Sequence, residues 1–154
     1  MESIVTRILD KKNIKYEIRL HTRKVYTSVE AAHERGVNLD QIVKCMIVKT
    51  PNDIYVLALL PGNRNLDAKL LSSYLNVKKV EIAKKEDVER ITGYRIGAIS
   101  PIGFKKQLKT VMDKKILNNE FITISAGRPD AGLYLKVKDL VLIINPEFSF
   151  ISKE

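Results

Sequence analysis

The stretch IVKCMIVKTPNDIYVLALL, residues 42–60 of a 154-residue chain, decides the fold. Its two apolar runs, Ile42 to Val48 and Ile54 to Leu60, are rich in residues that favour strands. Pro51, Asn52 and Asp53 lie between the runs and have the chemistry of a tight turn. The stretch therefore predicts a β-hairpin, which requires an antiparallel pair of strands.

Helical periodicity and capping residues predict helices on both sides of this hairpin. Ser3 is placed to cap the first helix, and Thr27 with Glu30 has the spacing of a capping box. Gly36 offers a left-handed stop, and Asn65 is placed to cap the helix that follows the hairpin. The predicted helices are Ile4–Leu9, Ser28–Arg35, Leu66–Leu75, Lys85–Ile91 and Val137–Ile144.

Further strands are predicted from alternating or apolar stretches. From Lys15 to Leu20, alternation places Tyr16, Ile18 and Leu20 on one half-buried face. Because helices and strands alternate irregularly, the fold class is α/β in composition (α+β), with a mixed, largely antiparallel central sheet flanked by helices. No linker or repeat interrupts the chain, so residues 1–154 are predicted to form a single domain. The other predicted strands are Lys79–Ile82, Thr110–Met112, Phe121–Ser125 and Gly132–Val137.

The chain is basic, with 27 Lys and Arg against 18 Asp and Glu and a formal charge of +9. Such an excess favours a polyanionic partner, because cations near phosphates release condensed counterions; the alternative is a charged surface that only aids solubility. The apolar runs are far too short to span a bilayer, and the N-terminus lacks the features of a secretory signal. A single cysteine allows no internal disulfide, which suits a cytoplasmic location.

Several common kinds of catalytic and cofactor site are missing from the sequence. One cysteine and two histidines cannot make a structural zinc site, and no Walker loop or GxGxxG run is present, so no metal and no cofactor are expected. His33 lies within a predicted helix, and we expect it on the surface. His21 lies at the end of a predicted strand, where a structural role is expected over a place in a pocket. Cys45 lies in an apolar strand, where a free cysteine behaves as a small buried hydrophobe.

Four segments remain that carry candidate chemistry. Lys44 interrupts an apolar strand, so it either reaches out to solvent or serves a site. Residues 59–67 form a turn between a strand and a helix. Residues 92–103 read TGYRIGAISPIG, and their three glycines let the backbone approach a ligand and offer N–H groups to an oxyanion. Residues 124–132 read ISAGRPDAG, a strand-to-loop transition with an arginine suited to phosphate.

In this order, the four segments resemble the YbaK and prolyl-tRNA synthetase-associated editing domains. The resemblance covers nearly the whole chain, from the helix that begins near Thr27 to the last helix. The family often has a second glycine where Ala98 stands and a small polar residue where Cys45 stands, and the preferred amino acid can differ accordingly. The matched pieces are IVK at 42–44, LPGNRNLD at 60–67, TGY at 92–94 with Gly97 and SPIG at 100–103, and SAGR at 125–128.

The resemblance implies a trans-acting deacylase that hydrolyses the ester of a mischarged tRNA, with Cys- or Ala-tRNA(Pro) expected first. It also implies few protein catalysts, with a hydroxyl or thiol of the substrate contributing to the chemistry. Lys44 would hold the terminal phosphate or the ester carbonyl, and the Gly93–Gly103 loop would supply backbone donors. The implied catalytic residues are Lys44, Gly97, Ala98 and Ser100, and the implied substrate-binding residues are Gly93, Tyr94, Pro101, Gly103, Ser125, Gly127 and Arg128.

The partners implied are the acceptor end of a tRNA, with tRNA-Pro first, and prolyl-tRNA synthetase as a docking protein. No membrane and no metal are implied. Two other functions stay open. One is a non-catalytic module of the same fold that binds tRNA or a synthetase, and the other is a hydrolase or binder of another small acyl or nucleotide compound.

Overall fold

The predicted hairpin forms the centre of a five-stranded sheet in the computed structural model, which describes residues 1–154. Strand β2 (Val43–Lys49) pairs antiparallel with β3 (Tyr55–Pro61) along its whole length, from Val43 opposite Pro61 to Lys49 opposite Tyr55. The sheet order is β5-β2-β3-β6-β9, and β6 and β9 join in parallel. The outer strands are β5 (Glu81–Ile82), β6 (Lys109–Asp113) and β9 (Glu147–Ser149).

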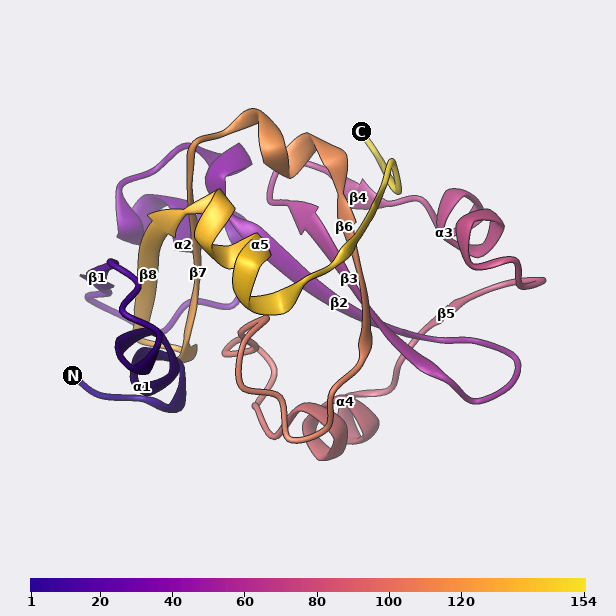
Figure 1. Ribbon diagram of the computed structural model, residues 1–154, viewed down its shortest axis with the longest axis horizontal. Helices are drawn as coiled ribbons and strands as arrows, with labels where there is room; N and C mark the ends of the chain where they lie inside the picture. Colours follow the sequence, from indigo (N-terminus) through magenta and orange to yellow (C-terminus); the bar gives the residue numbers. More distant parts are fainter.

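A second sheet of three strands lies beside the first (Figure 1). It has the order β1-β8-β7, with β1 (Glu17–Leu20), β7 (Phe121–Arg128) and β8 (Ala131–Lys136) paired antiparallel. A single parallel bridge between Ile42 and Thr123 connects the two sheets. Two short strands, β4 (Asn65–Leu66) and β10 (Ser152–Lys153), pair on their own and fasten the C-terminus to the turn after β3.

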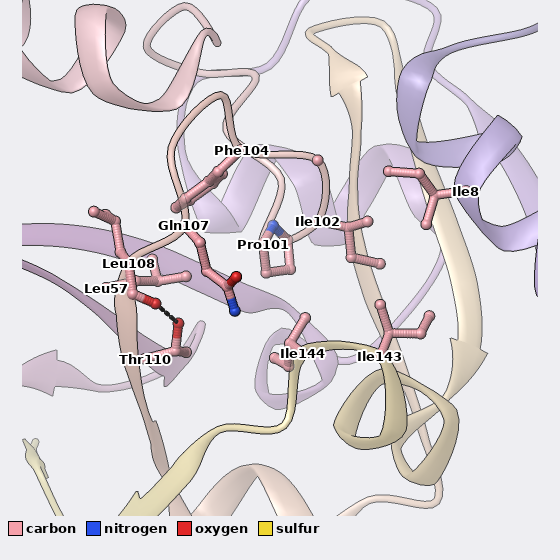
Figure 2. Close-up of a pocket in the computed structure, with 11 residues that line it drawn as sticks. Ile8, Leu57, Pro101, Ile102, Phe104, Gln107, Leu108, Thr110, Ile143 and Ile144 are labelled. Atoms are coloured by element: carbon pink, nitrogen blue, oxygen red, sulfur yellow. Dashed lines mark hydrogen bonds between the residues drawn. The ribbon is translucent and has the colours of Figure 1, made fainter.

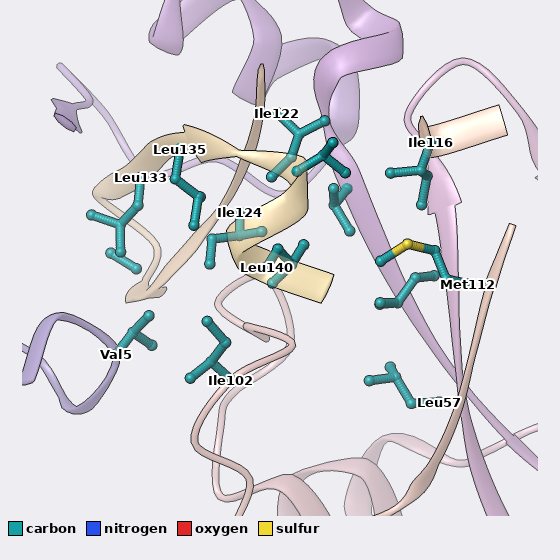
Figure 3. Packing of buried hydrophobic residues seen from close by; sticks show 14 of the residues in the cluster. Val5, Leu57, Ile102, Met112, Ile116, Ile122, Ile124, Leu133, Leu135 and Leu140 are labelled. Atoms are coloured by element: carbon teal, nitrogen blue, oxygen red, sulfur yellow. The ribbon is translucent and has the colours of Figure 1, made fainter. Parts of the chain in front are cut away.

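The largest hydrophobic cluster fills the space between the two sheets and the helices that cover them. Figure 3 shows Val5 from helix α1, Leu57 and Met112 from the five-stranded sheet, and Ile124 and Leu133 from the three-stranded sheet meeting in it. Burying one aliphatic side chain of this size stabilises a fold by about 1.5–3 kcal/mol. The cluster contains 19 buried residues, so it is the main source of cohesion between the sheets.

The helices begin and end largely at the residues that the sequence predicts. Ser3 caps α1 (Ile4–Lys11), and Thr27 and Glu30 form the predicted capping box of α2 (Ser28–Arg35), which Gly36 ends at φ 66°. Helix α4 (Lys85–Thr92) ends at Gly93 with φ 80°. The remaining helices are α3 (Ala68–Leu75), α5 (Val137–Ile144) and the short 3-10 helices η1 (Leu39–Gln41) and η2 (Lys114–Asn118).

The mixed, largely antiparallel architecture is confirmed, since five strand pairs are antiparallel and two are parallel. The strands are nevertheless divided among three sheets, because β7 and β8 pair with β1 and meet the other sheet only at one bridge. No sequence pattern predicted β4, β9, β10 or the two 3-10 helices. No helix is long and apolar enough to cross a membrane.

Two local predictions are wrong in part. Of the predicted half-buried face of the first strand, Tyr16 packs against the main cluster, but Ile18 and Leu20 are exposed, at 36% and 64%. Arg19 is the residue that packs inward, with its guanidinium carbon 4.5 Å from the ring centre of Tyr134. The third helix begins at Ala68 rather than Leu66, because residues 65–66 pair with β10.

The N-cap of α3 is therefore Asp67, whose carboxylate accepts hydrogen bonds from the backbone N–H groups of Lys69 and Leu70 at 3.1 Å. We expect Asp67→Ala to lower the free energy of unfolding by about 1 kcal/mol, as loss of a helix cap does. Asn65→Ala is the matched control and should cost less, since the Asn65 side chain makes only one long, exposed hydrogen bond. Urea denaturation of both variants measures the difference, and a larger loss for Asn65→Ala would contradict the assignment.

Candidate functional site

A cleft of about 600 Å³ lies beside Ile42, the residue before β2, whose isolated bridge to Thr123 connects the two sheets. The first half of β2 forms one wall, and the turn before α2 together with the inner face of that helix forms another. The lining is completed by Ile96, Gly97 and Ile99 of the Gly93–Gly103 loop (the glycine loop), by Ser125 on β7, and by Gly62, Ile82, Ala83 and Val88. The lining contains Lys44 and Arg35 but no aspartate, glutamate or histidine, so the cleft is cationic with largely apolar walls.

Lys44 is half-buried in the cleft wall and held from one side. Its ammonium donates a hydrogen bond of 2.6 Å to the backbone oxygen of Arg64, in the turn that follows β3. Arg64 in turn donates from its side chain to the hydroxyl and backbone oxygen of Ser152, so β10 fixes this turn. Burial lowers the pKa of Lys44. An ammonium has three N–H donors, so two remain for a ligand.

Gly62 lets the same turn approach the start of β2. Its N–H donates to the backbone oxygen of Ile42 at 2.8 Å. A Cβ atom on Gly62 would lie 2.5 Å from the backbone oxygen of Leu39 and 2.8 Å from Cβ of Ile42. The LPGN segment therefore needs glycine because the chain passes too close to its neighbours for any side chain.

Two residues of the glycine loop that line the cleft have unpaired backbone N–H groups. Gly97 has φ 90°, a conformation that side chains disfavour, and a Cβ there would lie 2.9 Å from the Tyr26 ring. The backbone N–H groups of Gly97 and Ile99, both lining residues, make no hydrogen bond within the protein. Unpaired N–H groups beside a cation are the arrangement that stabilises a developing oxyanion.

Ser125 connects this loop to β7. Its hydroxyl donates to the backbone oxygen of Ala98 at 3.1 Å and accepts from the N–H of Gly127 at 3.0 Å. Gly127 has φ 86° and lies in the irregular pairing between Ser125 and Arg128. The guanidinium of Arg128 is exposed and bonded to both carboxylate oxygens of Asp130, at 2.9 and 2.8 Å, and it does not line the cleft.

The other predicted residues lie behind the cleft lining. Ala98 and Ser100 are buried, and the Ser100 hydroxyl is 3.5 Å from the N–H of Ile102. Tyr94 is buried in the main cluster and donates its hydroxyl to the backbone oxygen of Ile102, and Gly93 ends α4. Lys44, Gly97 and Ser125 are therefore the predicted site residues that the structure brings together in the cleft.

Pro101 and Gly103 line a different, mainly apolar cavity of about 280 Å³ (Figure 2). Figure 2 shows the loop around Pro101 and Phe104 on one side of this cavity, with Ile8 of α1 and Ile143 at the end of α5 on the other. A Cβ on Gly103 would lie 2.7 Å from the Tyr94 hydroxyl, so Gly103 leaves room for the contact that closes the loop.

Arg35 is the cleft residue that sequence reasoning missed. It is 6% exposed and donates from Nε to Nε2 of His21 at 3.1 Å and from Nη1 to the hydroxyl of Thr123 at 3.0 Å. His21 itself bonds the backbone oxygen of Pro129 at 3.0 Å, so its role is structural as predicted. A signal was present: Arg35 lies four residues after Ala31 and therefore on the buried face of α2.

The thiol of Cys45 lines the cleft, and burial raises its pKa to about 12. It is therefore a neutral, weak nucleophile near pH 7. His33 is exposed, as predicted.

Comparison with known proteins shows what this geometry resembles. The family model for the aminoacyl-tRNA editing domain matches residues 22–143. EbsC of Enterococcus faecalis, named as a candidate Cys-tRNA(Pro)/Cys-tRNA(Cys) deacylase, is 30% identical over 95% of this chain and 90% of its own length. ProXp-y of Escherichia coli, named as a multifunctional Ser/Thr-tRNA deacylase, is 30% identical over 85% of this chain and 81% of its own. A solved structure described as a candidate trans-editing enzyme for prolyl-tRNA synthetase superimposes with a TM-score of 0.85 at 22% identity, covering 100% of this chain and 99% of its own.

Ser125→Ala removes the hydroxyl that donates to the backbone oxygen of Ala98 and accepts from the N–H of Gly127. Because it leaves a buried carbonyl without its donor, we expect a loss of about 1–3 kcal/mol in the free energy of unfolding. Chemical denaturation measures it, and Ser73→Ala on the exposed side of α3 is the control. An unchanged unfolding midpoint for Ser125→Ala would show that the hydroxyl does not hold the loop.

The burial of His21 makes stability depend on pH. Burial is the main cause that lowers the pKa of His21, and the charge of Arg35 adds to it, whereas the hydrogen bond to Pro129 and the charges of Glu34 and Asp130 oppose the shift. The folded state then binds fewer protons than the unfolded state, so stability falls as the pH drops through the unfolded value of about 6.5. We expect urea midpoints to decrease from pH 7 to 5, less so in His21→Gln, and to the wild-type extent in His33→Gln. Equal slopes in all three proteins would contradict this reading.

Proposed function

Because this chain belongs to the aminoacyl-tRNA editing domain family, we propose that it is a trans-acting deacylase that hydrolyses the ester of mischarged tRNA. The observation that carries the proposal is the cleft itself, which sets the Lys44 ammonium and the unpaired N–H groups of Gly97 and Ile99 in one cavity without a carboxylate. Cys- and Ala-tRNA(Pro) are the substrates to test first. The relatives named as deacylases of Cys-tRNA and of Ser/Thr-tRNA support the reaction class.

The chemistry follows from these donors. The oxygen of a water molecule adds to the ester carbonyl carbon, the bond to the ribose oxygen breaks, and a proton ends on that ribose oxygen. Negative charge develops on the carbonyl oxygen, where the N–H donors of Gly97 and Ile99 and the Lys44 ammonium stabilise it. The family resemblance implies that a hydroxyl or thiol of the substrate orients the water, which is consistent with a lining that contains no histidine or carboxylate.

The remaining predicted residues have supporting roles in this proposal. Ser125 and Tyr94 hold the loop that carries the donors, and Ala98 and Ser100 pack it against the core. Arg128 and Gly127 border the path of the acceptor end. The charge of +9 favours phosphate contacts that weaken as salt rises. Selection of tRNA-Pro then requires contacts to acceptor bases or docking on prolyl-tRNA synthetase. The proposed location of the protein is the cytoplasm, where charged tRNA is used.

The test is deacylation of tRNA-Pro charged with Cys, Ala, Ser or Pro. We expect one mischarged species to be hydrolysed and Pro-tRNA(Pro) to be spared. Lys44→Ala should lower kcat/KM by about 100-fold, because one charged donor to a developing oxyanion is worth about that much.

Lys49→Ala is the matched control, since Lys49 lies on the same strand, pairs with Asp53 and does not line the cleft. It should retain nearly full activity. Full activity of a folded Lys44→Ala protein would refute the assignment of Lys44. If the wild-type protein binds tRNA without hydrolysing the ester, the non-catalytic module is favoured. If it neither binds nor hydrolyses any of these tRNAs, another small acyl or nucleotide compound is favoured as its ligand or substrate.

A further inference from the structure

Arg35 is a buried cation without a buried anion beside it. It is 6% exposed at the end of α2, yet it forms no ion pair within 4.0 Å. Its protein partners, the Nε2 of His21 and the hydroxyl of Thr123, are neutral acceptors. An uncompensated buried charge destabilises a fold, so a guanidinium retained in this state needs a reason beyond packing.

One nitrogen of this guanidinium is left for a ligand. Nε and Nη1 are used within the protein, whereas Nη2 makes no hydrogen bond to it. No fully buried side-chain nitrogen or oxygen lacks a partner, so Nη2 must retain access to solvent. Arg35 lines the cleft, so we infer that Nη2 reaches solvent through the cleft.

The protein makes room for the guanidinium and fixes its orientation. A Cβ atom on Gly132 would collide with Nε and Cζ of Arg35, so the group lies directly against the backbone of β8. Gly132 is paired with Ser125, a lining residue, and Thr123 lies two positions earlier on the same face of β7. Held by Thr123, His21 and the β8 backbone, Nη2 is a preorganised donor on the inner wall of the cleft.

The ligand for such a donor carries an oxygen that accepts hydrogen bonds. Because Nη2 is a cationic donor in a cleft without a carboxylate, the group that contacts it is a hydroxyl, carbonyl or anionic oxygen rather than an ammonium. In the substrate class proposed above, the ester carbonyl is already assigned to Lys44 and the loop N–H groups, and a ribose hydroxyl is common to every aminoacyl group and would give no preference among them. The oxygens left are those of the aminoacyl side chain and of a phosphodiester. A phosphodiester continues into a polymer on both sides and has poor access to a side chain that is 6% exposed, whereas an amino-acid side chain is small and terminal.

We propose that Arg35 is a specificity-determining residue that hydrogen-bonds an oxygen on the side chain of the ester-linked amino acid. This inference rests on the proposed function. A site that satisfies a buried donor with a substrate oxygen discriminates against an analogue that lacks the oxygen, because the donor is then left unpaired. Among small mischarged amino acids, hydroxyl-bearing serine and threonine are therefore preferred over alanine.

The experiment measures binding and requires no turnover. The probes are adenosine analogues with serine or alanine joined to the 3′ position through an amide, each with and without a 5′-phosphate. By calorimetry, the wild-type protein should bind the seryl probe about tenfold more tightly than the alanyl probe, with or without the phosphate. Failure of deacylation with this preference intact would overturn the proposed reaction and leave the inference standing.

Two variants test Arg35 by independent routes. Arg35→Leu removes the donor, and Gly132→Ala keeps it but displaces it through the added Cβ. In both, the seryl preference should fall to less than twofold, whereas affinity for the alanyl probe should change little. Arg35→Lys, which keeps the charge without the fixed fork, should recover only part of the preference. Thermal melts establish that each variant is folded, and should Arg35→Leu not fold, Gly132→Ala carries the test.

Three outcomes would overturn the inference. The first is equal binding of the seryl and alanyl probes by the wild-type protein, and the second is a preference that persists in a folded Arg35→Leu or Gly132→Ala protein. The third is a loss of affinity for the 5′-phosphorylated probes alone in these variants, which would assign Arg35 to the phosphate instead.

Discussion

The parallel bridge between Ile42 and Thr123 is the constraint on which the site depends. It joins two sheets that otherwise pair only within themselves, and β2 and β7 separate immediately after it. Ile42 is held on its other side by the N–H of Gly62, and the Thr123 hydroxyl accepts from Arg35. The cleft opens where this pairing ends, so the residues that follow the bridge on both strands, Lys44 and Ser125, become lining residues.

The electrostatics of the cleft follow from what each cation is bonded to. Lys44 is anchored by a backbone carbonyl and Arg35 by a hydroxyl and a neutral imidazole, so neither charge is neutralised within the protein. Both cations therefore retain their attraction for a substrate oxygen, and burial strengthens that attraction by excluding water. This arrangement requires His21 to stay neutral, because only a neutral imidazole can accept the hydrogen bond from Arg35.

The glycine loop lies between the cleft and the hydrophobic core. Gly97 and Ile99 line the cleft, whereas Tyr94 and Ile102 belong to the main hydrophobic cluster. The Tyr94 hydroxyl and the Ser125 hydroxyl each satisfy a loop carbonyl, which leaves other N–H groups of the loop free. A loop fixed at its carbonyls can present its amides without moving, which is the preorganisation that oxyanion stabilisation requires.

The sequence by itself determined the features that depend on neighbours along the chain. The β2–β3 hairpin, the Thr27–Glu30 capping box and the left-handed stops at Gly36 and Gly93 follow from turn and cap chemistry within a few residues. The family motifs also located Lys44, Gly97 and Ser125, which line the cleft. Only the tertiary structure decided the rest. The β4–β10 pair moved the cap of α3 to Asp67, the edge position of β1 exposed Leu20, and Arg35 became a buried donor because β7, β8 and His21 converge on it. The physical reason is that burial and hydrogen-bond partners at these positions come from segments far apart in the chain, such as Arg35 and Thr123, which are 88 residues apart, and local propensity carries no information about such pairs.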